Sequence, residues 1–167
     1  MARIAGELVI NRPVDEVFDF VADERNEPRY NPRIRRAEKL SPGPIGRGTR
    51  FRAEAVTRGR TVGMTIDYTA YERPRQLGSS IHMAAADILG TLRFDPVPDG
   101  TWMSWSWEMR LRGLYRLLTP IIVGAGRRQE QENWAGLKRF LEGQQSLVGN
   151  PETERDLRQA QAMRLVR

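Results

Sequence analysis

Tyr68 and Glu130 are the two residues whose types and positions best suit them to chemistry. Each falls on the apolar face of its segment, Tyr68 in an alternating stretch and Glu130 in an amphipathic one. A buried tyrosine hydroxyl can orient a ligand carbonyl, and a carboxylate in an apolar cavity has a raised pKa. The two could therefore act as acid and base in an enolisation or a dehydration. The alternative for Glu130 is an ion pair with Arg127, or a helix rotated so that Glu130 faces water.

Most other catalytic chemistries lack the residues they need. The chain has no cysteine and a single histidine, which excludes thiolate metal sites and cysteine nucleophiles. Strand parity places that histidine, His82, on the outer face, opposite Ile81 and Met83, and it places Asp67 on the outer face as well. The sequence contains no glycine-rich phosphate loop and no nucleophile elbow. We therefore expect no cofactor and no metal.

The segment 119–143 predicts a long helix that carries its own start and stop signals. Thr119 is a suitable N-cap, and Pro120 stands in the first turn, where its missing N–H costs nothing. Gly143 is placed to end the helix in a left-handed conformation. The apolar residues that share one face of this helix are Ile122, Val123, Trp134, Leu137, Phe140 and Leu141.

Three residues interrupt this apolar face near its middle, namely Gly126, Glu130 and Asn133. Polar groups on a buried face need hydrogen-bond partners or water. We therefore expect the C-terminal half of this face to pack against the protein without water, and the N-terminal half to border open space. We interpret the helix as the lid and wall of an internal cavity.

The beginning of the chain predicts one strand followed by two short helices. Residues 3–10 alternate weakly and form the strand. Asn11 or Arg12 is expected to cap a helix that Pro13 opens. The next segment, 26–31, forms a second short helix or a turn.

From residue 33 onward the hydrophobic pattern has a period of two, which predicts a series of strands. A glycine between the second and third of them, Gly59, indicates a hairpin. Successive strands joined by short turns form an antiparallel meander with one buried face. The fold class is therefore α+β, a bent sheet of about seven strands that grips the terminal helix. The six strands of the meander are expected at 33–41, 48–58, 60–72, 76–84, 87–96 and 101–111.

The inward positions of these strands, with the interruptions of the helix, are expected to line the cavity. Methionine and aromatic side chains at alternate positions form an adaptable apolar wall, although the same residues would also suit a solid core. The expected ligand-binding residues are Met64, Ile66, Tyr68, Ile81, Met83, Leu92, Met103, Trp105, Trp107, Gly126, Glu130 and Asn133.

The length of 167 residues favours one domain, which we place at 1–147, followed by a tail at 148–167 that is a short helix or disordered. No window approaches the roughly 20 apolar residues of a membrane span. The lack of cysteine fits a cytoplasmic protein. The net charge of +6 suggests nucleic-acid binding, but the basic residues are dispersed, and we expect no nucleic-acid partner.

Four stretches of the chain resemble a known family: VINRPVDEVFDFVADERNEPRYNP, GPIGRGTRFR, GTWMSWSWEM and LKRFLEG. They are similar to the polyketide cyclase/dehydrase-like branch of the START-related (SRPBCC) superfamily, over about residues 3–143. The resemblance implies the helix-grip fold, in which a curved seven-stranded antiparallel sheet wraps around a long C-terminal helix, with two short helices between strands 1 and 2. It also implies a hydrophobic cavity between sheet and helix.

The leading function is the binding or carrying of a hydrophobic small molecule in that cavity, such as a lipid, an isoprenoid or a polyketide-like compound. The alternative is an enzyme, a cyclase or dehydratase that uses Tyr68 and Glu130 as acid and base. A second alternative, motivated by the net charge of +6, is a basic module that associates with RNA or the ribosome. A homodimer is compatible with the sequence.

Overall fold

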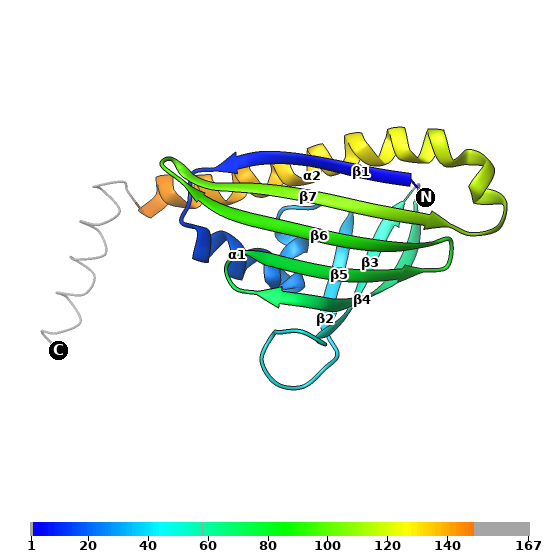
Figure 1. The fold of residues 1–167 in the computed structure, drawn as a ribbon, viewed down its shortest axis with the longest axis horizontal. Coiled ribbons are helices and arrows are strands. Elements are labelled where there is room, and N and C mark those ends of the chain that lie inside the picture. The colour runs from blue at the N-terminus through cyan, green and yellow to red at the C-terminus, as the bar shows by residue number, and fades with distance from the viewer. Residues whose placement is uncertain (1, 58, 149–167) are drawn as a thin grey trace, which may run out of the picture.

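The computed structural model describes residues 2–57 and 59–148 and shows a seven-stranded antiparallel sheet that curves around a long helix (Figure 1). The strand order is β1-β7-β6-β5-β4-β3-β2, so β1 completes one edge of a meander that runs from β2 to β7. The predicted α+β fold is confirmed. The strands are β1 (Ala2–Ile10), β2 (Ile34–Lys39), β3 (Arg50–Thr57), β4 (Arg60–Glu72), β5 (Gln76–Met83), β6 (Ala86–Val97) and β7 (Gly100–Leu111).

Alternation of side chains gives the sheet one concave, mostly apolar face. The register pairs Tyr68 with Ser79, Ser79 with Gly90, and Gly90 with Trp107, so one row of residues crosses four strands. Tyr68 and Ser79 are buried, whereas Trp107 keeps part of its surface accessible. The row thus runs from Tyr68, which contacts the end of α1, to Trp107, which contacts α2.

Two short helices connect β1 to β2, as predicted. They are α1 (Val14–Ala22) and the 3₁₀ helix η1 (Glu24–Arg29). The predicted cap by Asn11 or Arg12 is wrong, because Pro13 occupies the N-cap position and no side chain bonds to the free N–H groups there. The two residues before Pro13 bond to carboxylates and a carbonyl elsewhere instead.

The long helix begins at Thr119, as predicted, and ends later than predicted. A 3₁₀ helix that was not predicted, η2 (Gly113–Leu118), runs directly into α2 (Thr119–Val148). The helix also continues past Gly143, because one glycine inside a helix costs only about 1 kcal/mol. The predicted tail at 148–167 lies, beyond its first residue, outside the described residues.

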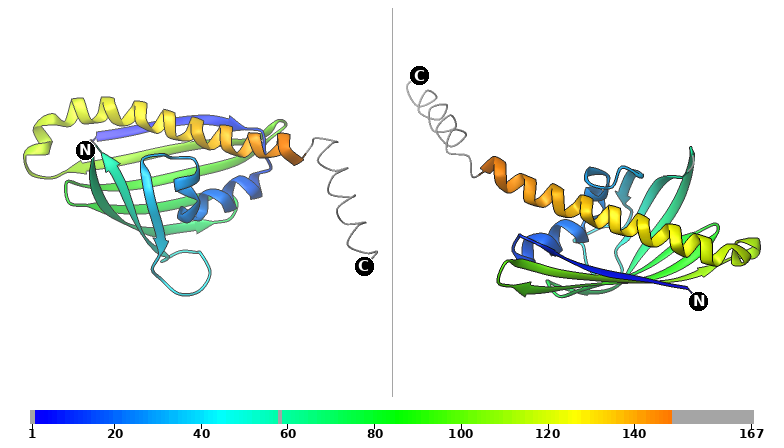
Figure 2. Two further views of the ribbon diagram at one scale, coloured as in Figure 1. Left: turned by 180° about the vertical axis from the view of Figure 1, so that it is seen from behind. Right: turned by 90° about the horizontal axis from the view of Figure 1, so that it is seen from above.

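The C-terminal half of α2 fixes the helix across the concave side of the sheet (Figure 2). Trp134, Leu137 and Leu141 are buried in the core. The C-terminal half of the apolar face therefore packs against the protein, as predicted. Nζ of Lys138 donates to the carbonyl of Val9 at 2.6 Å and ties the helix to the end of β1. Within the described part of the chain, no helix is long and apolar enough to cross a membrane.

Thr101 joins the start of β7 to the corner between β1 and α1. It is fully buried, and its Oγ1 donates to the carbonyl of Arg12 at 2.7 Å. Thr101→Val keeps the shape of the side chain and removes this hydrogen bond, so we expect the free energy of unfolding to fall by about 1–2 kcal/mol. Urea denaturation measures the loss. Thr57→Val, at an exposed position of β3, should change stability by less than about 0.5 kcal/mol. Equal losses in the two variants would contradict the assignment.

Candidate functional site

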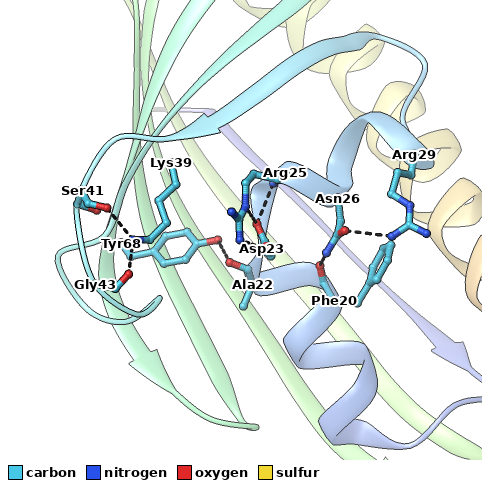
Figure 3. A network of polar contacts seen from close by, with 10 residues as sticks. All are labelled: Phe20, Ala22, Asp23, Arg25, Asn26, Arg29, Lys39, Ser41, Gly43 and Tyr68. Atoms are coloured by element: carbon cyan, nitrogen blue, oxygen red, sulfur yellow. Dashed lines mark hydrogen bonds and ion pairs between the residues drawn. The ribbon is translucent and has the colours of Figure 1, made fainter.

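The hydroxyl of Tyr68 lies at the junction of α1 and η1 (Figure 3). Its Oη donates to the carbonyl of Ala22 at 2.8 Å and lies 3.1 Å from Oε1 of Glu24. One hydroxyl proton serves only one acceptor at a time, and a carbonyl can only accept. Both contacts are therefore satisfied together when Glu24 carries a proton and donates it to Tyr68. Burial, with the nearby Glu24, raises the pKa of Tyr68 above its ordinary value.

Glu24 and Glu27 lie on the same side of η1, because a 3₁₀ helix has three residues per turn. Burial raises the pKa of Glu24 well above its ordinary value, and the charge of Glu27 adds to this effect. Burial also raises the pKa of Glu27 to about 7, although Asn31 Nδ2 donates to its Oε1 at 2.9 Å. Both side chains keep some accessible surface, although the surrounding protein desolvates their carboxyl groups.

Glu130 points into the fold, where its Oε2 accepts two indole N–H groups. Nε1 of Trp107 donates to it at 2.7 Å, and Nε1 of Trp134 at 3.0 Å. Burial raises the pKa of Glu130, and the two hydrogen bonds offset part of that rise. The alternative in which Glu130 pairs with Arg127 or faces water is wrong, since Arg127 is exposed and Glu130 has its partners inside.

Aromatic rings surround this carboxylate. The ring of Trp134 stacks on Tyr30 at a centroid distance of 6.5 Å and lies 5.7 Å from the ring of Trp105. Two buried polar atoms here, Nε1 of Trp105 and Oδ1 of Asn133, have no hydrogen-bond partner among the described residues. Buried polar groups in proteins nearly always have a partner. One of these two atoms is a donor and the other an acceptor, and both lack a partner within the described chain.

The predicted wall residues lie on the concave side of the sheet or on the facing side of α2. Gly126 differs from the other predicted wall residues in its role, because it lies close to β1. A Cβ at this position would lie 2.7 Å from Cδ1 of Ile4. The glycine thus allows α2 to approach β1 closely and does not form a wall. Ligand binding by the other predicted wall residues remains a prediction. Those buried are Ile66, Tyr68, Leu92, Met103 and Trp105, and those partly accessible are Met64, Ile81, Met83, Trp107, Glu130 and Asn133.

Two hollows open at the end of the sheet where α2 begins. The larger has a volume of about 730 Å³, which is in the usual range for small-molecule sites. The smaller, of about 380 Å³, takes in two of the predicted wall residues, Met64 and Met83. Of these two hollows only the larger reaches α2, at Thr119, and neither is lined by Trp105, Glu130 or Asn133. The larger hollow is lined by Ala2, Asp87, Met109, Arg110, Leu111, Arg112, Gly113 and Thr119.

His82 and Asp67 lie on the outer face of the sheet, as strand parity predicts. Nδ1 of His82 lies 2.9 Å from Oδ1 of Asp87, which also bonds the guanidinium of Arg112. Asp67 forms an ion pair with Arg50. In residues 2–57 and 59–148, no group of three histidine, aspartate or glutamate side chains is close enough together to hold a metal ion.

Glu24 and Glu27 are the functional candidates that the sequence analysis missed. A signal for them existed, because two acidic residues three apart in a short segment share one side of a 3₁₀ helix. The side that faces the interior depends on how η1 packs against β2 and β4. No local pattern in the sequence specifies that packing.

The curved antiparallel sheet around a long C-terminal helix is the fold of the helix-grip class of proteins. More specifically, the chain belongs to the family described as polyketide cyclase / dehydrase and lipid transport, whose model matches residues 1–142. No curated protein is similar enough in sequence to count as a relative.

Several solved structures share the fold. A protein of Thermus thermophilus has a TM-score of 0.74 at 18% identity, over 85% of this chain and 98% of that one. A START superfamily protein of Mycobacterium smegmatis has a TM-score of 0.68 at 15% identity, over 87% of this chain and 98% of that one. The di-domain ARO/CYC protein BexL, from the BE-7585A biosynthetic pathway, has a TM-score of 0.71 at 24% identity, over 91% of this chain and 48% of that one. At these identities the likeness shows the fold alone.

Proposed function

We propose that the chain binds an apolar small molecule on the concave side of its sheet, in the space that opens toward the start of α2. The observation that carries this proposal is the pair of buried, unpartnered atoms, Nε1 of Trp105 and Oδ1 of Asn133, in a largely apolar part of the described interior. The larger hollow reaches Met109 and Leu111, which follow Trp105 and Trp107 at alternate positions of β7. The family description, which includes lipid transport, agrees with a role as a carrier.

A fluorescent apolar probe, N-phenyl-1-naphthylamine, tests the proposal. We expect it to bind the wild-type protein with a Kd in the micromolar range. Asn133→Phe places a ring in the interior and should weaken binding about tenfold or more, because the ring takes up the space of the probe. Gln131→Phe, at an exposed position of the same helix, is the matched control and should bind as the wild type does. Equal affinities in the two variants, both folded by circular dichroism, would place the probe elsewhere.

An enzyme of the cyclase or dehydratase type is the second candidate. It is favoured by the contact between Tyr68 and Glu24, which sets a hydroxyl beside a carboxyl group whose pKa is raised by burial. The chemistry that such an enzyme requires is proton transfer to and from a carbonyl compound. Tyr68→Phe and Glu130→Gln variants that bind a β-polyketone thioester with unchanged affinity and lose its turnover would favour the enzyme. Turnover that both variants retain would remove it.

A further inference from the structure

Three carboxyl groups face the interior and form what we call the interior carboxyl cluster, namely Glu24, Glu27 and Glu130. Two come from η1 and one from α2, so separate parts of the chain converge on one space. They lie close enough to influence one another, since the charge of Glu130 contributes to the raised pKa of Glu27. In the part of the chain that the structure describes, no lysine, arginine or histidine forms an ion pair with any of the three.

This lack of a cation contrasts with the rest of the molecule. The chain has 27 basic residues against 21 acidic ones, so cations are plentiful. Carboxylates with a lowered pKa elsewhere in the described ranges each bond a basic side chain. A charge that is largely removed from water and has no counter-charge is costly, so a cation from outside the chain would stabilise the ionised cluster. The pairs found elsewhere are Asp19 with Arg73, Asp23 with Arg25, Asp87 with Arg112, and Glu142 with Lys138.

The aromatic rings beside the cluster point to the same kind of ligand. Trp134 donates to Glu130 through its indole N–H and packs between Tyr30 and Trp105. The faces of tryptophan and tyrosine rings attract cations, most strongly where water is excluded. An ammonium group near Glu130 would thus meet a carboxylate that lies among aromatic side chains.

The unpartnered atoms give a second, independent observation. Trp105 is 5% exposed, its ring lies against that of Trp134, and its Nε1 has a proton to donate that no described residue accepts. Oδ1 of Asn133, on the turn of α2 that follows Glu130, can accept one. A ligand that satisfies both atoms carries a donor and an acceptor. Because ring faces are a usual part of sites that bind organic ammonium groups, this environment favours an organic cation.

We propose that the interior carboxyl cluster and the rings of Trp105, Trp107 and Trp134 select an apolar molecule that bears a protonated amine and a hydrogen-bond acceptor. This proposal rests on the proposed function and narrows it to one class of ligand. The amine would lie against the carboxylates, its apolar body against the methionine and tryptophan side chains of β4 and β7, and its acceptor near Nε1 of Trp105.

Isothermal titration calorimetry at pH 8 with two probes of equal shape tests this selection. The probes are 2-(1-naphthyl)ethylamine, which is a cation at this pH, and 2-(1-naphthyl)ethanol, which is neutral. We expect the amine to bind about tenfold or more tightly than the alcohol. Glu130→Gln and the double variant Glu24→Gln/Glu27→Gln should each remove most of this ratio. Glu132→Gln, exposed on α2, should keep the ratio.

The outcomes separate the two proposals. Equal binding of amine and alcohol leaves the apolar site in place and overturns the selection of a cation. A preference for the amine that survives in both interior variants, shown to be folded by their thermal transitions, also overturns it, because the cation would then bind elsewhere. Failure of both probes to bind counts against the apolar site and the selection alike.

Discussion

Gly90→Ala should destabilise the protein by about 3–5 kcal/mol, a large effect for the addition of one methyl group. A Cβ at Gly90 would overlap the six-membered ring of Trp107 and would lie 2.7 Å from Oγ of Ser79. The indole cannot move aside freely, because its Nε1 donates to Glu130 at 2.7 Å. Relief of the clash therefore costs packing and also leaves a carboxylate without one of its two indole donors.

Urea denaturation followed by far-UV circular dichroism measures this loss. Gly63→Ala is the matched control, since Gly63 also lies within a strand but is exposed and has open space around its missing Cβ. Alanine there should leave stability unchanged or raise it slightly, because it lowers the entropy of the unfolded chain. A loss below about 1 kcal/mol for Gly90→Ala would show that Trp107 has another position available.

The sheet was predictable because each strand carries its own period-two pattern. Tyr68 and Trp107 stand at inward positions by parity alone, and the structure places them in one row across the sheet. The hairpin at Gly59 was also predictable, since its φ of +75° is a conformation that glycine adopts without strain. Local pattern is sufficient here because alternation and turn residues act over a few positions.

The C-terminal end of α2 was not predictable in the same way. The helix begins at the predicted Thr119 but extends beyond Gly143, although glycine is a good terminal residue. The cost of a glycine inside a helix is small compared with the burial of neighbours such as Leu141. Packing therefore decides how far the helix extends.

The candidate site was predicted only in part, because its polar contacts also depend on packing. Helical period placed Glu130 on the inward face, but its two partners come from β7 and from the next turn of α2, and only the folded chain brings them together. Glu24 and Glu27 received no role because the orientation of η1 is set by tertiary contacts, such as that between Tyr68 and Ala22. The polar half of the site is thus a product of long-range packing.

Glu27→Gln should stabilise the protein at pH 8 and change its stability little at pH 4.5. Burial raises the pKa of Glu27 to about 7 in the folded state, from an ordinary value of 4.5 in the unfolded chain. Between these two pH values the folded protein keeps a proton that the unfolded chain has released. The contribution of Glu27 to stability is therefore fully present below pH 4.5 and is lost as the pH rises through 7.

Glutamine does not titrate, and its carbonyl still accepts the hydrogen bond from Asn31 Nδ2. The stability that Glu27→Gln gains over the wild type should consequently grow between pH 4.5 and 7 and level off above pH 7. We expect on the order of 2 kcal/mol at pH 8, reduced from the full shift because part of the side chain is accessible, or about 4–8 °C in Tm. Differential scanning calorimetry at the two pH values measures this difference in stability.

Glu132→Gln, whose exposed carboxylate pairs with Arg128, should show no such growth. A constant difference between Glu27→Gln and the wild type across this range would mean that Glu27 ionises alike in the folded and unfolded states, and that the interior around η1 is as wet as the surface.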